Sequence, residues 1–299
     1  MRRKKSRTML RRSIQFLLVL MVALPSPFLG AQRPPAGVND PLLESGNAGR
    51  ISAPANPPAE IKIVSYNIRW RSGKELQQIV DWLPKKPAII GLQEVDRARQ
   101  RSGNTNNARV LAESLGMYYA WAAPPAAGNE QEEETGVALF SPYPLTDLRR
   151  IVLPHAGPGG RYRVALGATI KLGKITVRVY SVHSETRIPV AQKIDQLQSV
   201  LDDLKRFPQT MPAIVLGDFN SWELPAIEGI RRLFQSDGFA TPFPDHQTTF
   251  KRKVLGLEVE LKLDWIWLRG FSAEQYGIDR ALTVSDHFPL WTVAKLPAG

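Results

Sequence analysis

Short apolar runs that end in polar residues recur along this 299-residue chain. The clearest is Pro212–Leu216, a run short enough for a buried strand, which leads directly into Gly217, Asp218, Phe219 and Asn220. A glycine at this place allows the backbone to turn tightly at the end of the strand. Comparable runs, which we also interpret as strands, span residues 61–66, 87–92, 117–122, 136–140, 161–172, 175–182, 261–268 and 282–293.

Apolar residues at helical spacing predict helices between these strands. Residues 76–83 place four apolar side chains on one helical face, behind the capping-box sequence Ser72–Glu75, and residues 190–207 carry a similar stripe. The element order is β-α-β-α-β-β-β-β-α-β-α-β-β, which has too many adjacent strands for a purely parallel sheet. We therefore predict an α/β (α+β) domain over residues 59–297, with two mixed sheets packed face to face and helices outside.

The N-terminal residues have a different character. Seven basic residues and no acidic residue lie before position 31, and they precede an apolar run at 14–24 that is typical of a signal-peptide core and short for a membrane span. We predict export to the periplasm or the extracellular space, with residues 1–31 a signal peptide or, if uncleaved, a membrane anchor through residues 14–31. Residues 32–58 contain six prolines without periodicity, which predicts a disordered linker.

Composition narrows the range of chemistries. The formal net charge is +11, but without the seven N-terminal cations 32 basic residues face 28 acidic ones, a net charge of +4. That balance is weak evidence for a polyanionic partner, although local basic clusters can still matter. The chain has no cysteine, which excludes disulfides and thiolate metal sites.

Polar side chains recur at or near the ends of the predicted strands. Each has an ordinary structural alternative, such as a turn residue, a solvated strand end or a core histidine, so the inference rests on their joint occurrence. Asp264 interrupts an apolar strand, where an unpaired carboxylate is costly, so we expect it to have a partner or an ion. Asp218 and Asn220 are two residues apart and point the same way if the chain stays extended. The full set is Asn67, Glu94, His183, Asp218, Asn220, Asp264, Asp286 and His287.

Such a set supports a narrow range of reactions. The carboxylate of Glu94, with that of Asp286 or Asp218, suits Mg²⁺ or Mn²⁺, and a divalent cation neutralises a phosphate and stabilises a leaving oxygen. Histidines at the same edge contact phosphoryl oxygens and move protons near neutral pH. Asp264 can orient His287, while Asp218 and Asn220 position the attacking water. Together these roles predict hydrolysis of a phosphate ester.

Six short motifs, in order, resemble those of the endonuclease/exonuclease/phosphatase superfamily. The resemblance covers about residues 60–295 and implies a four-layer α/β/β/α sandwich with a Mg²⁺-dependent site at one edge. The motifs are Ser65-Tyr66-Asn67-Ile68, Leu92-Gln93-Glu94-Val95-Asp96, Val182-His183, Gly217-Asp218-Phe219-Asn220-Ser221, Leu263-Asp264-Trp265-Ile266 and Ser285-Asp286-His287-Phe288-Pro289-Leu290.

The resemblance also implies roles for the individual residues. Glu94 is the implied metal ligand with Asn67 and Asp286 near the metal, Asp218 and Asn220 handle the nucleophilic water, and His183 and His287 contact the scissile phosphate. Asp218 and His287 are both candidates for the general base. Arg163 is similar to a phosphate-contacting arginine of the family, and its alternative is a solvated charge on a strand.

We therefore expect an exported, monomeric Mg²⁺- or Mn²⁺-dependent phosphoesterase. Its substrate is either a nucleic acid (DNA or RNA) or a phosphate of the phospholipid or inositol-phosphate type. The alternative function is a catalytically silent binding module on the same scaffold, since fold does not settle function. The basic cluster at Lys251–Lys253 is either a contact for an anionic substrate or a solvated loop.

Overall fold

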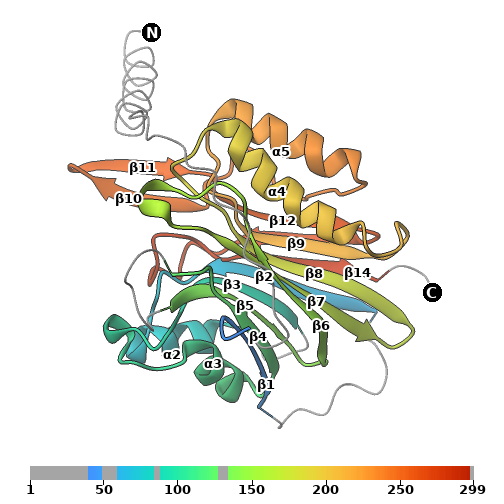
Figure 1. The fold of residues 1–299 in the computed structure, drawn as a ribbon, viewed down its shortest axis with the longest axis horizontal. Helices are drawn as coiled ribbons and strands as arrows, with labels where there is room; N and C mark the ends of the chain where they lie inside the picture. Colours follow the sequence, from blue (N-terminus) through green and yellow to red (C-terminus); the bar gives the residue numbers. More distant parts are fainter. Residues whose placement is uncertain (1–39, 49–58, 84–87, 127–133, 297–299) are drawn as a thin grey trace. The chain divides into compact units, whose positions relative to one another are not determined.

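Two β-sheets pack face to face in the computed structural model of the protein, which describes residues 40–48, 59–83, 88–126 and 134–296 (Figure 1). These residues belong to one of the two units into which the chain divides, residues 35–299. The predicted signal peptide or anchor at 1–31 lies outside the described residues. Within the part of the chain that the structure describes, no helix is both long and apolar enough to span a membrane.

The larger sheet has seven strands and the smaller has five. In both sheets one neighbouring pair is parallel, β2 with β3 and β8 with β9, and the other pairs are antiparallel, so both sheets are mixed as predicted. The larger sheet runs β1 (Leu43–Asn47), β4 (Tyr118–Ala122), β5 (Glu134–Ser141), β3 (Ala88–Arg97), β2 (Glu60–Asn67), β14 (Leu290–Lys295), β13 (Ser272–Ile278). The smaller runs β12 (Asp264–Arg269), β9 (Ala213–Asp218), β8 (Ile175–His183), β7 (Val164–Leu172), β6 (Leu145–Val152).

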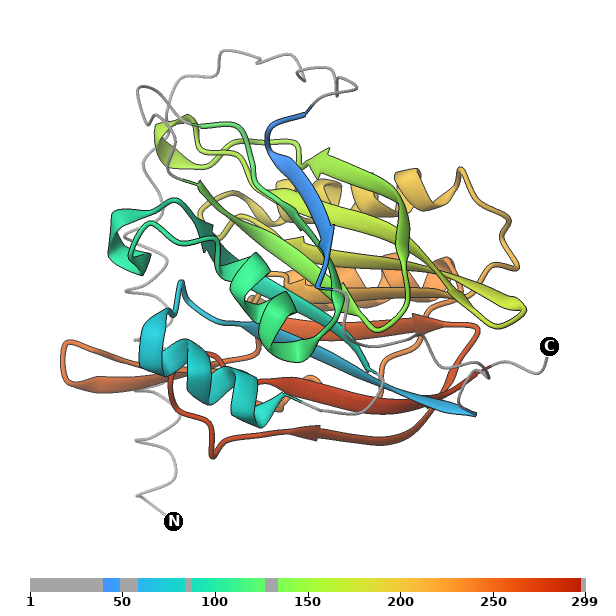
Figure 2. The same cartoon turned by 90° about the horizontal axis from the view of Figure 1, so that it is seen from below.

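Four helices cover the outer faces of the two sheets and complete a four-layer arrangement (Figures 1 and 2). Side chains of α2 (Gly73–Trp82) and α3 (Asn107–Leu115) share a buried cluster with the larger sheet, and those of α4 (Val190–Leu204) and α5 (Leu224–Ser236) share one with the smaller sheet. Two short 3-10 turns lie at Gln100–Ser102 and Pro158–Gly160. The four-layer α/β/β/α architecture is therefore confirmed.

The main core lies between the sheets and consists of the inward-facing side chains of both. Ile63 and Ile89 of the larger sheet meet Leu166 and Leu216 of the smaller sheet there, and all four are fully buried. Trp265 and Trp267 are also fully buried, but on the other face of the smaller sheet, against α5, where their rings stack 5.4 Å apart. Alternation along strands thus supplies both faces of the smaller sheet with apolar side chains, as a sheet covered on both sides requires.

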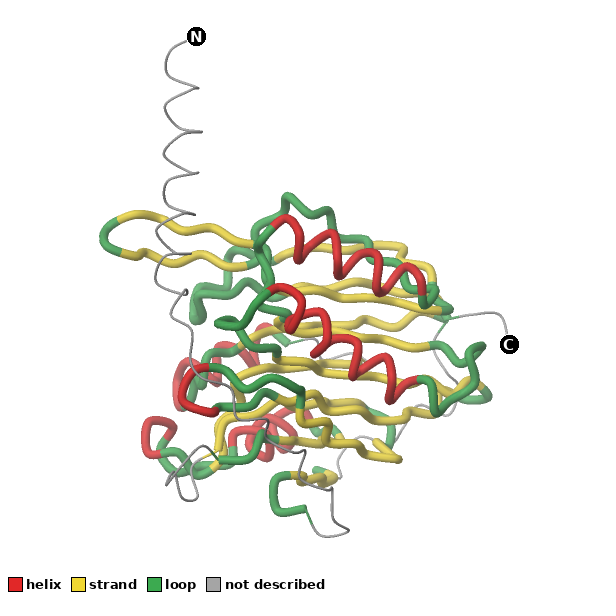
Figure 3. Tube along the Cα trace, turned by 45° about the horizontal axis from the view of Figure 1, so that its top comes forward, coloured by secondary structure: helices red, strands yellow, loops and turns green. Residues whose placement is uncertain are grey.

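A separate two-stranded hairpin leaves the smaller sheet before β12. It consists of β10 (Phe250–Val254) and β11 (Leu257–Leu261), which pair only with each other as a sheet. Figures 1 and 3 show it extending beyond the ends of the neighbouring strands. The sequence analysis did not predict β10 and most of β11, because charged residues make up about half of these short strands, and it also missed β6 and β13.

Two sequence predictions are wrong in the structure. Residues 43–47, inside the predicted disordered linker, form β1 and pair with β4, because Leu43 packs against the core and Glu44 accepts hydrogen bonds from Arg97, Arg109 and Tyr119. Residues 32–39 and 49–58 lie outside the described residues. The predicted capping box is not formed: Ser72 makes no side-chain cap, and Glu75 pairs with Arg71 at 3.2 Å.

Gly217 is required by the packing of β9 against β8. Its φ is +142°, and a Cβ at this position would lie 2.0 Å from the backbone oxygen of Val182. We expect Gly217→Ala to lower the free energy of unfolding by about 3 kcal/mol, because the atom it meets is backbone and cannot move aside. Urea unfolding followed by tryptophan fluorescence measures this change.

Gly159 is the matched control for this substitution. Its φ is also positive, +77°, but nothing lies within 4 Å of its Cβ position. Gly159→Ala should cost only the backbone strain, about 1 kcal/mol. Equal losses in the two variants would show that the close approach of β8 and β9 contributes nothing.

Candidate active site

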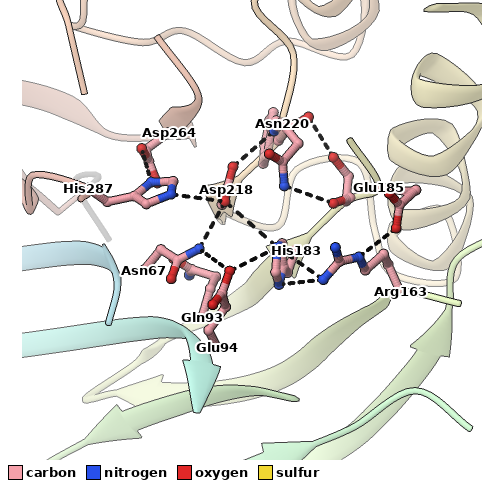
Figure 4. Close-up of polar contacts among 12 residues, drawn as sticks. Asn67, Gln93, Glu94, Arg163, His183, Glu185, Asp218, Asn220, Asp264 and His287 are labelled. Atoms are coloured by element: carbon pink, nitrogen blue, oxygen red, sulfur yellow. Dashed lines mark hydrogen bonds and ion pairs between the residues drawn. The ribbon is translucent and has the colours of Figure 1, made fainter. Parts of the chain in front are cut away.

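Three of the predicted site residues lie in one row across the smaller sheet. His183 ends β8, Asp218 ends β9 and Asp264 begins β12. The register pairs His183 with Asp218, and Asp218 with Asp264. Since the side-chain period of a strand is two, a slip of one residue would turn any of these side chains to the other face. Pairing of the strands therefore sets the row (Figure 4).

The larger sheet supplies two more residues from its neighbouring parallel strands. Asn67 ends β2, and Glu94 lies in β3 where the register shifts between Gln93 and Val95. Glu94 has a φ of +55°, uncommon for a residue with a side chain, and such a bulge re-aims the side chain. Its carboxylate consequently meets the amide of Asn67.

Asn67 connects the site residues of the larger sheet with those of the smaller sheet. Its Nδ2 donates to Oε1 of Glu94 at 3.2 Å and to Oδ2 of Asp218 at 3.0 Å. Its own Oδ1 accepts the backbone N–H of Arg69 at 2.9 Å, which fixes the direction in which the nitrogen points. Asn67 therefore presents a donor, rather than an oxygen ligand, to the two carboxylates.

His287 lies between two carboxylates of the smaller sheet. Its Nδ1 is 2.9 Å from Oδ2 of Asp264, and its Nε2 is 3.7 Å from Oδ2 of Asp218. The edge of the Phe250 ring packs against the imidazole, with the ring centroids 5.0 Å apart. Asp264 is only 1% exposed, so the expectation that this buried carboxylate has a partner is confirmed.

His183 occupies the other side of Asp218 and is covered by Arg163. Its Nε2 lies 3.7 Å from Oδ2 of Asp218 and 3.9 Å from Oε1 of Glu94. Nη1 of Arg163 lies 3.4 Å from the same nitrogen, while its Nε donates to Oε2 of Glu185 at 2.8 Å. Figure 4 shows Arg163 extended between His183 and Glu185.

Glu185 is a site residue that the sequence analysis missed. It is 3% exposed and holds the guanidinium of Arg163 beside His183. Its position two residues after His183 was a signal, because residues two apart on an extended chain share a side. The sequence analysis did not include Glu185 because the predicted strand ends before this residue.

The prediction that Asp218 and Asn220 lie on an extended chain and point the same way is wrong. Strand β9 ends at Asp218, and Asn220 has a φ of +46°, so the chain between them is not extended. The backbone N–H of Asn220 donates to Oδ1 of Asp218 at 3.0 Å in an Asx turn, and its Nδ2 donates to the backbone oxygen of Ser184 at 3.0 Å. Asn220 thus braces Asp218 by its backbone and the end of β8 by its side chain.

Asp286 faces a different partner from its neighbour His287. Oδ2 of Asp286 lies 3.4 Å from Nη1 of Arg69. Ser285, one residue earlier, donates to the backbone oxygen of Asn67 at 2.8 Å and accepts the backbone N–H of His287 at 3.2 Å. This segment therefore ties the larger sheet to His287, and the role of Asp286 near a metal stays a prediction.

The surroundings of His183 and His287 shift the pKa values of the two imidazoles in opposite directions. Burial, reinforced by the positive charge of Arg163, holds the pKa of His183 well below 6.5. Burial alone would also lower the pKa of His287, but the carboxylates of Asp264 and Asp218 outweigh burial and raise it to about 10. At neutral pH His183 is a neutral imidazole and His287 an imidazolium.

Asp218 is the carboxylate placed to exchange a proton. Its burial raises its pKa to about 7, against the opposing effect of the positive charge on His287. Its Oδ2 lies 3.7 Å from Nε2 of both histidines. A group that titrates near neutral pH, between a neutral and a charged imidazole, suits acid–base chemistry.

The residues present fit a hard divalent cation at Glu94. Oε2 of Glu94 is buried and has no hydrogen-bond partner among the described residues, a costly state that a cation would relieve. Asp218, Asp264 and His287 also place one ligand atom each within 4.8 Å of one another. In that second group, however, Nδ1 of His287 is engaged by Asp264, and a protonated imidazole cannot ligate a metal.

Comparison with known proteins identifies a family whose model matches the chain. The model of the Endonuclease/Exonuclease/phosphatase family matches residues 64–287, most of the chain. No curated protein matches. The matched range includes every site residue predicted from the sequence.

Several solved structures share the fold. An endonuclease/exonuclease/phosphatase from Beutenbergia cavernae DSM 12333 is similar with a TM-score of 0.63 and 16% identity, over 81% of this chain and 72% of that one. D. rerio TDP2 complexed with single-strand DNA product has a TM-score of 0.61 and 14% identity, over 80% and 100%. ANGEL2, a 2′,3′-cyclic phosphatase in complex with adenosine-2′,3′-vanadate, has a TM-score of 0.60 and 15% identity, over 88% and 100%.

The charge on His287 depends on Asp264. In Asp264→Asn we expect the pKa of His287 to fall from about 10 toward its ordinary value of about 6.5, because burial is then opposed by one carboxylate fewer. Histidine side-chain NMR shifts across a pH titration of wild type and variant measure the change. His183, neutral in both proteins, serves as the internal control, and an unaltered pKa for His287 would contradict the assignment.

Proposed function

The chain belongs to the endonuclease/exonuclease/phosphatase family, and from this membership and the geometry of the site we propose that it is a metal-dependent hydrolase of phosphate esters. The observation that carries the proposal is the convergence of Glu94, Asp218 and His287 from both sheets at one edge. Asn67 hydrogen-bonds to the first two, and the imidazole of His287 is 3.7 Å from the second. The groups required to bind a phosphate, move a proton and hold a cation are therefore within reach of one substrate.

Asp218 accepts the proton of the attacking water in this proposal. Asn220 holds its Oδ1 through a backbone N–H, and this leaves Oδ2 on the side of the two histidines. The water oxygen bonds to phosphorus while the ester bond to the leaving oxygen breaks. Between the sequence candidates for general base, Asp218 is preferred over His287, because His287 is already protonated at neutral pH.

Two positive groups, His287 and Arg163, and the neutral imidazole of His183 hold the phosphate in this proposal. His287, kept as an imidazolium by Asp264, donates from Nε2 to a phosphoryl oxygen, and His183 contacts the same group from the opposite side of Asp218. Arg163 supplies a guanidinium beside His183, oriented by Glu185. An arginine held in this way binds phosphate with fixed geometry.

Glu94 is the residue proposed to hold the divalent cation, Mg²⁺ or Mn²⁺. When bound, the cation supplies positive charge that neutralises the phosphate and stabilises the leaving oxygen. Asn67 orients the carboxylate of Glu94 by donating to its Oε1, which leaves Oε2 for the ion. Asp286 is the proposed further ligand.

The substrate proposed is a phosphodiester or phosphomonoester of the nucleic-acid or the phospholipid and inositol-phosphate type. The TDP2 complex with single-strand DNA product supports the first class, and the predicted export favours an extracellular or membrane-bound substrate. We further propose that the protein is exported, on the basis of the basic and apolar pattern in residues 1–31, and that it is a monomer.

Loss of the imidazolium should abolish most of the activity. We expect His287→Gln to lower kcat/KM for bis-p-nitrophenyl phosphate, with Mg²⁺ or Mn²⁺ present, by about 10²- to 10⁴-fold. The matched control is His155→Gln, since the imidazole of His155 contacts Asp195 of α4. Wild-type protein that binds phosphate esters tightly without hydrolysing them would instead support the silent binding module.

Cation binding can be measured without turnover. Free Mn²⁺ gives an electron paramagnetic resonance signal that disappears on binding, so a titration yields the dissociation constant directly. We expect Glu94→Gln to weaken Mn²⁺ binding by at least about tenfold, because the amide removes the ligand charge. Glu75→Gln, on the exposed face of α2, should bind as wild type does. Equal affinities in all three proteins would remove Glu94 from the cation site.

A further inference from the structure

Exposed apolar side chains gather at the tip of the hairpin formed by β10 and β11. Leu255 is 86% exposed, Leu257 47% and Val254 40%. Among the described residues these are three of the six large hydrophobic side chains that are exposed. Single exposed apolar residues need no explanation, but three within four positions of one another form a patch.

The turn at the tip carries a leucine where backbone geometry favours asparagine. Leu255 and Gly256 connect the strands with φ values of +49° and +80°, and Val254 pairs with Leu257 on either side. A two-residue turn with two positive φ angles favours Asn-Gly or Asp-Gly, because a branched apolar side chain is strained there. Leu255 gains no burial in return, so folding of the hairpin does not account for it.

Two basic residues without an ion pair among the described residues, Arg252 and Lys253, immediately precede the tip in β10. Nζ of Lys251 pairs with Glu258 at 3.1 Å and Glu260 at 3.6 Å, which occupies both acidic groups of the hairpin. Within the described part of the chain, neither Arg252 nor Lys253 makes an ion pair. The tip therefore combines apolar groups with positive charge.

A basic groove continues from the hairpin toward the active site. It has a volume of about 510 Å³, and Ser285, which also contacts Asn67 and His287, lies in its wall. Its charged lining residues are the basic Lys251, Arg252, Lys253 and Arg280 and the acidic Glu258 and Glu260, so positive charge is in excess. The groove is thus suited to anionic groups between the tip and the site.

The base of the hairpin is attached to the catalytic edge. Phe250 forms a β-bridge with His287, and the backbone N–H of Lys251 donates to the backbone oxygen of Asp286 at 2.8 Å. Strand β12 then begins opposite Asp218. Five residues of β10 span about 15 Å from this base to the tip. Figures 1 and 3 show the hairpin extending outward from the end of the smaller sheet.

We propose that the hairpin tip, residues 254–257, inserts into an anionic lipid surface and holds the active site next to it. Leucine and valine side chains enter the acyl boundary, while Arg252 and Lys253 contact the anionic headgroups. This combination of an apolar tip with flanking cations favours a membrane over a nucleic acid, which would not stabilise exposed aliphatic groups. The inference goes beyond hydrolysis, because lipid binding requires no turnover.

A probe on Leu255 tests insertion directly. The chain has no cysteine, so Leu255→Cys in the full chain can be labelled at that one position with an environment-sensitive nitrobenzoxadiazole fluorophore. With vesicles of equal parts phosphatidylcholine and phosphatidylglycerol we expect a blue shift and quenching by nitroxide lipids. The control Val110→Cys, on exposed α3, should show neither change. An unshifted probe at 255, with vesicles in excess, would overturn the proposal.

A second variant removes the patch without weakening the hairpin. Asn-Gly is the favoured turn and threonine keeps strand propensity, so Val254→Thr, Leu255→Asn and Leu257→Thr together preserve the fold. In the full chain, where residues 1–31 are common to both proteins, we expect vesicle partitioning to fall by on the order of tenfold or more. Val110→Thr should partition as wild type does. Equal partitioning of the triple variant and wild type would overturn the proposal.

Vesicle binding at two salt concentrations and a probe measurement with DNA distinguish a lipid surface from a nucleic acid. Raising NaCl from about 0.1 M to about 1 M shortens the Debye length from about 10 Å to about 3 Å and should weaken binding to anionic vesicles. A shift of the probe at 255 with DNA but not with vesicles would overturn the lipid assignment. Protein that inserts its tip but hydrolyses no phosphate ester would contradict the proposed function and leave this inference intact.

Discussion

The pairing register at one end of the two sheets is the constraint on which the site depends. His183, Asp218 and Asp264 are neighbours because β8, β9 and β12 pair as they do, and no loop has to bring them together. Such placement on paired strands is more rigid than placement on loops. The close approach of Gly217 to Val182 belongs to the same constraint, since any larger residue would separate the strands that carry the row.

Burial of two carboxylates beside two imidazoles is tolerable because the groups compensate one another. Asp264 and Asp218 are each 1% exposed, and an unpaired buried carboxylate would be strongly destabilising. The imidazolium of His287 lies between them, and Asn67 donates to Asp218. The same compensation divides the histidines into one charged and one neutral group. The arrangement that stabilises the folded state therefore also sets the protonation states of the side chains in the site.

Local sequence patterns were sufficient to predict most of the fold and to select the residues that meet at one edge of the sheets. Apolar runs located the central strands, and a carboxylate within an apolar strand was enough to infer that Asp264 has a partner. The structure supplies His287 as that partner. The resemblance to the family implies the same residues for one site.

The sequence analysis failed where a local pattern competes with long-range contacts. The prolines around β1 suggested disorder, but Glu44 gains four partners from other parts of the chain, Arg97, Asn106, Arg109 and Tyr119. Asn220 leaves the extended conformation because its backbone and side chain satisfy groups on β9 and β8. Glu185 lies outside any periodic segment, and the short alternation of β11, where leucine and valine alternate with Glu258 and Glu260, was not used as a strand signal.

The hairpin differs from the row of His183, Asp218 and Asp264 in the structural constraint that acts on it. Its strands pair only with each other as a sheet, and its contacts with the site are made at Phe250 and Lys251, at its base. Side chains at the tip therefore change without disturbing the register that places Asp218 and Asp264. The positive φ and the exposure of Leu255 show that neither backbone preference nor burial in the domain favours leucine there. The physical separation of tip and base therefore leaves the geometry of the site independent of the residues at the tip.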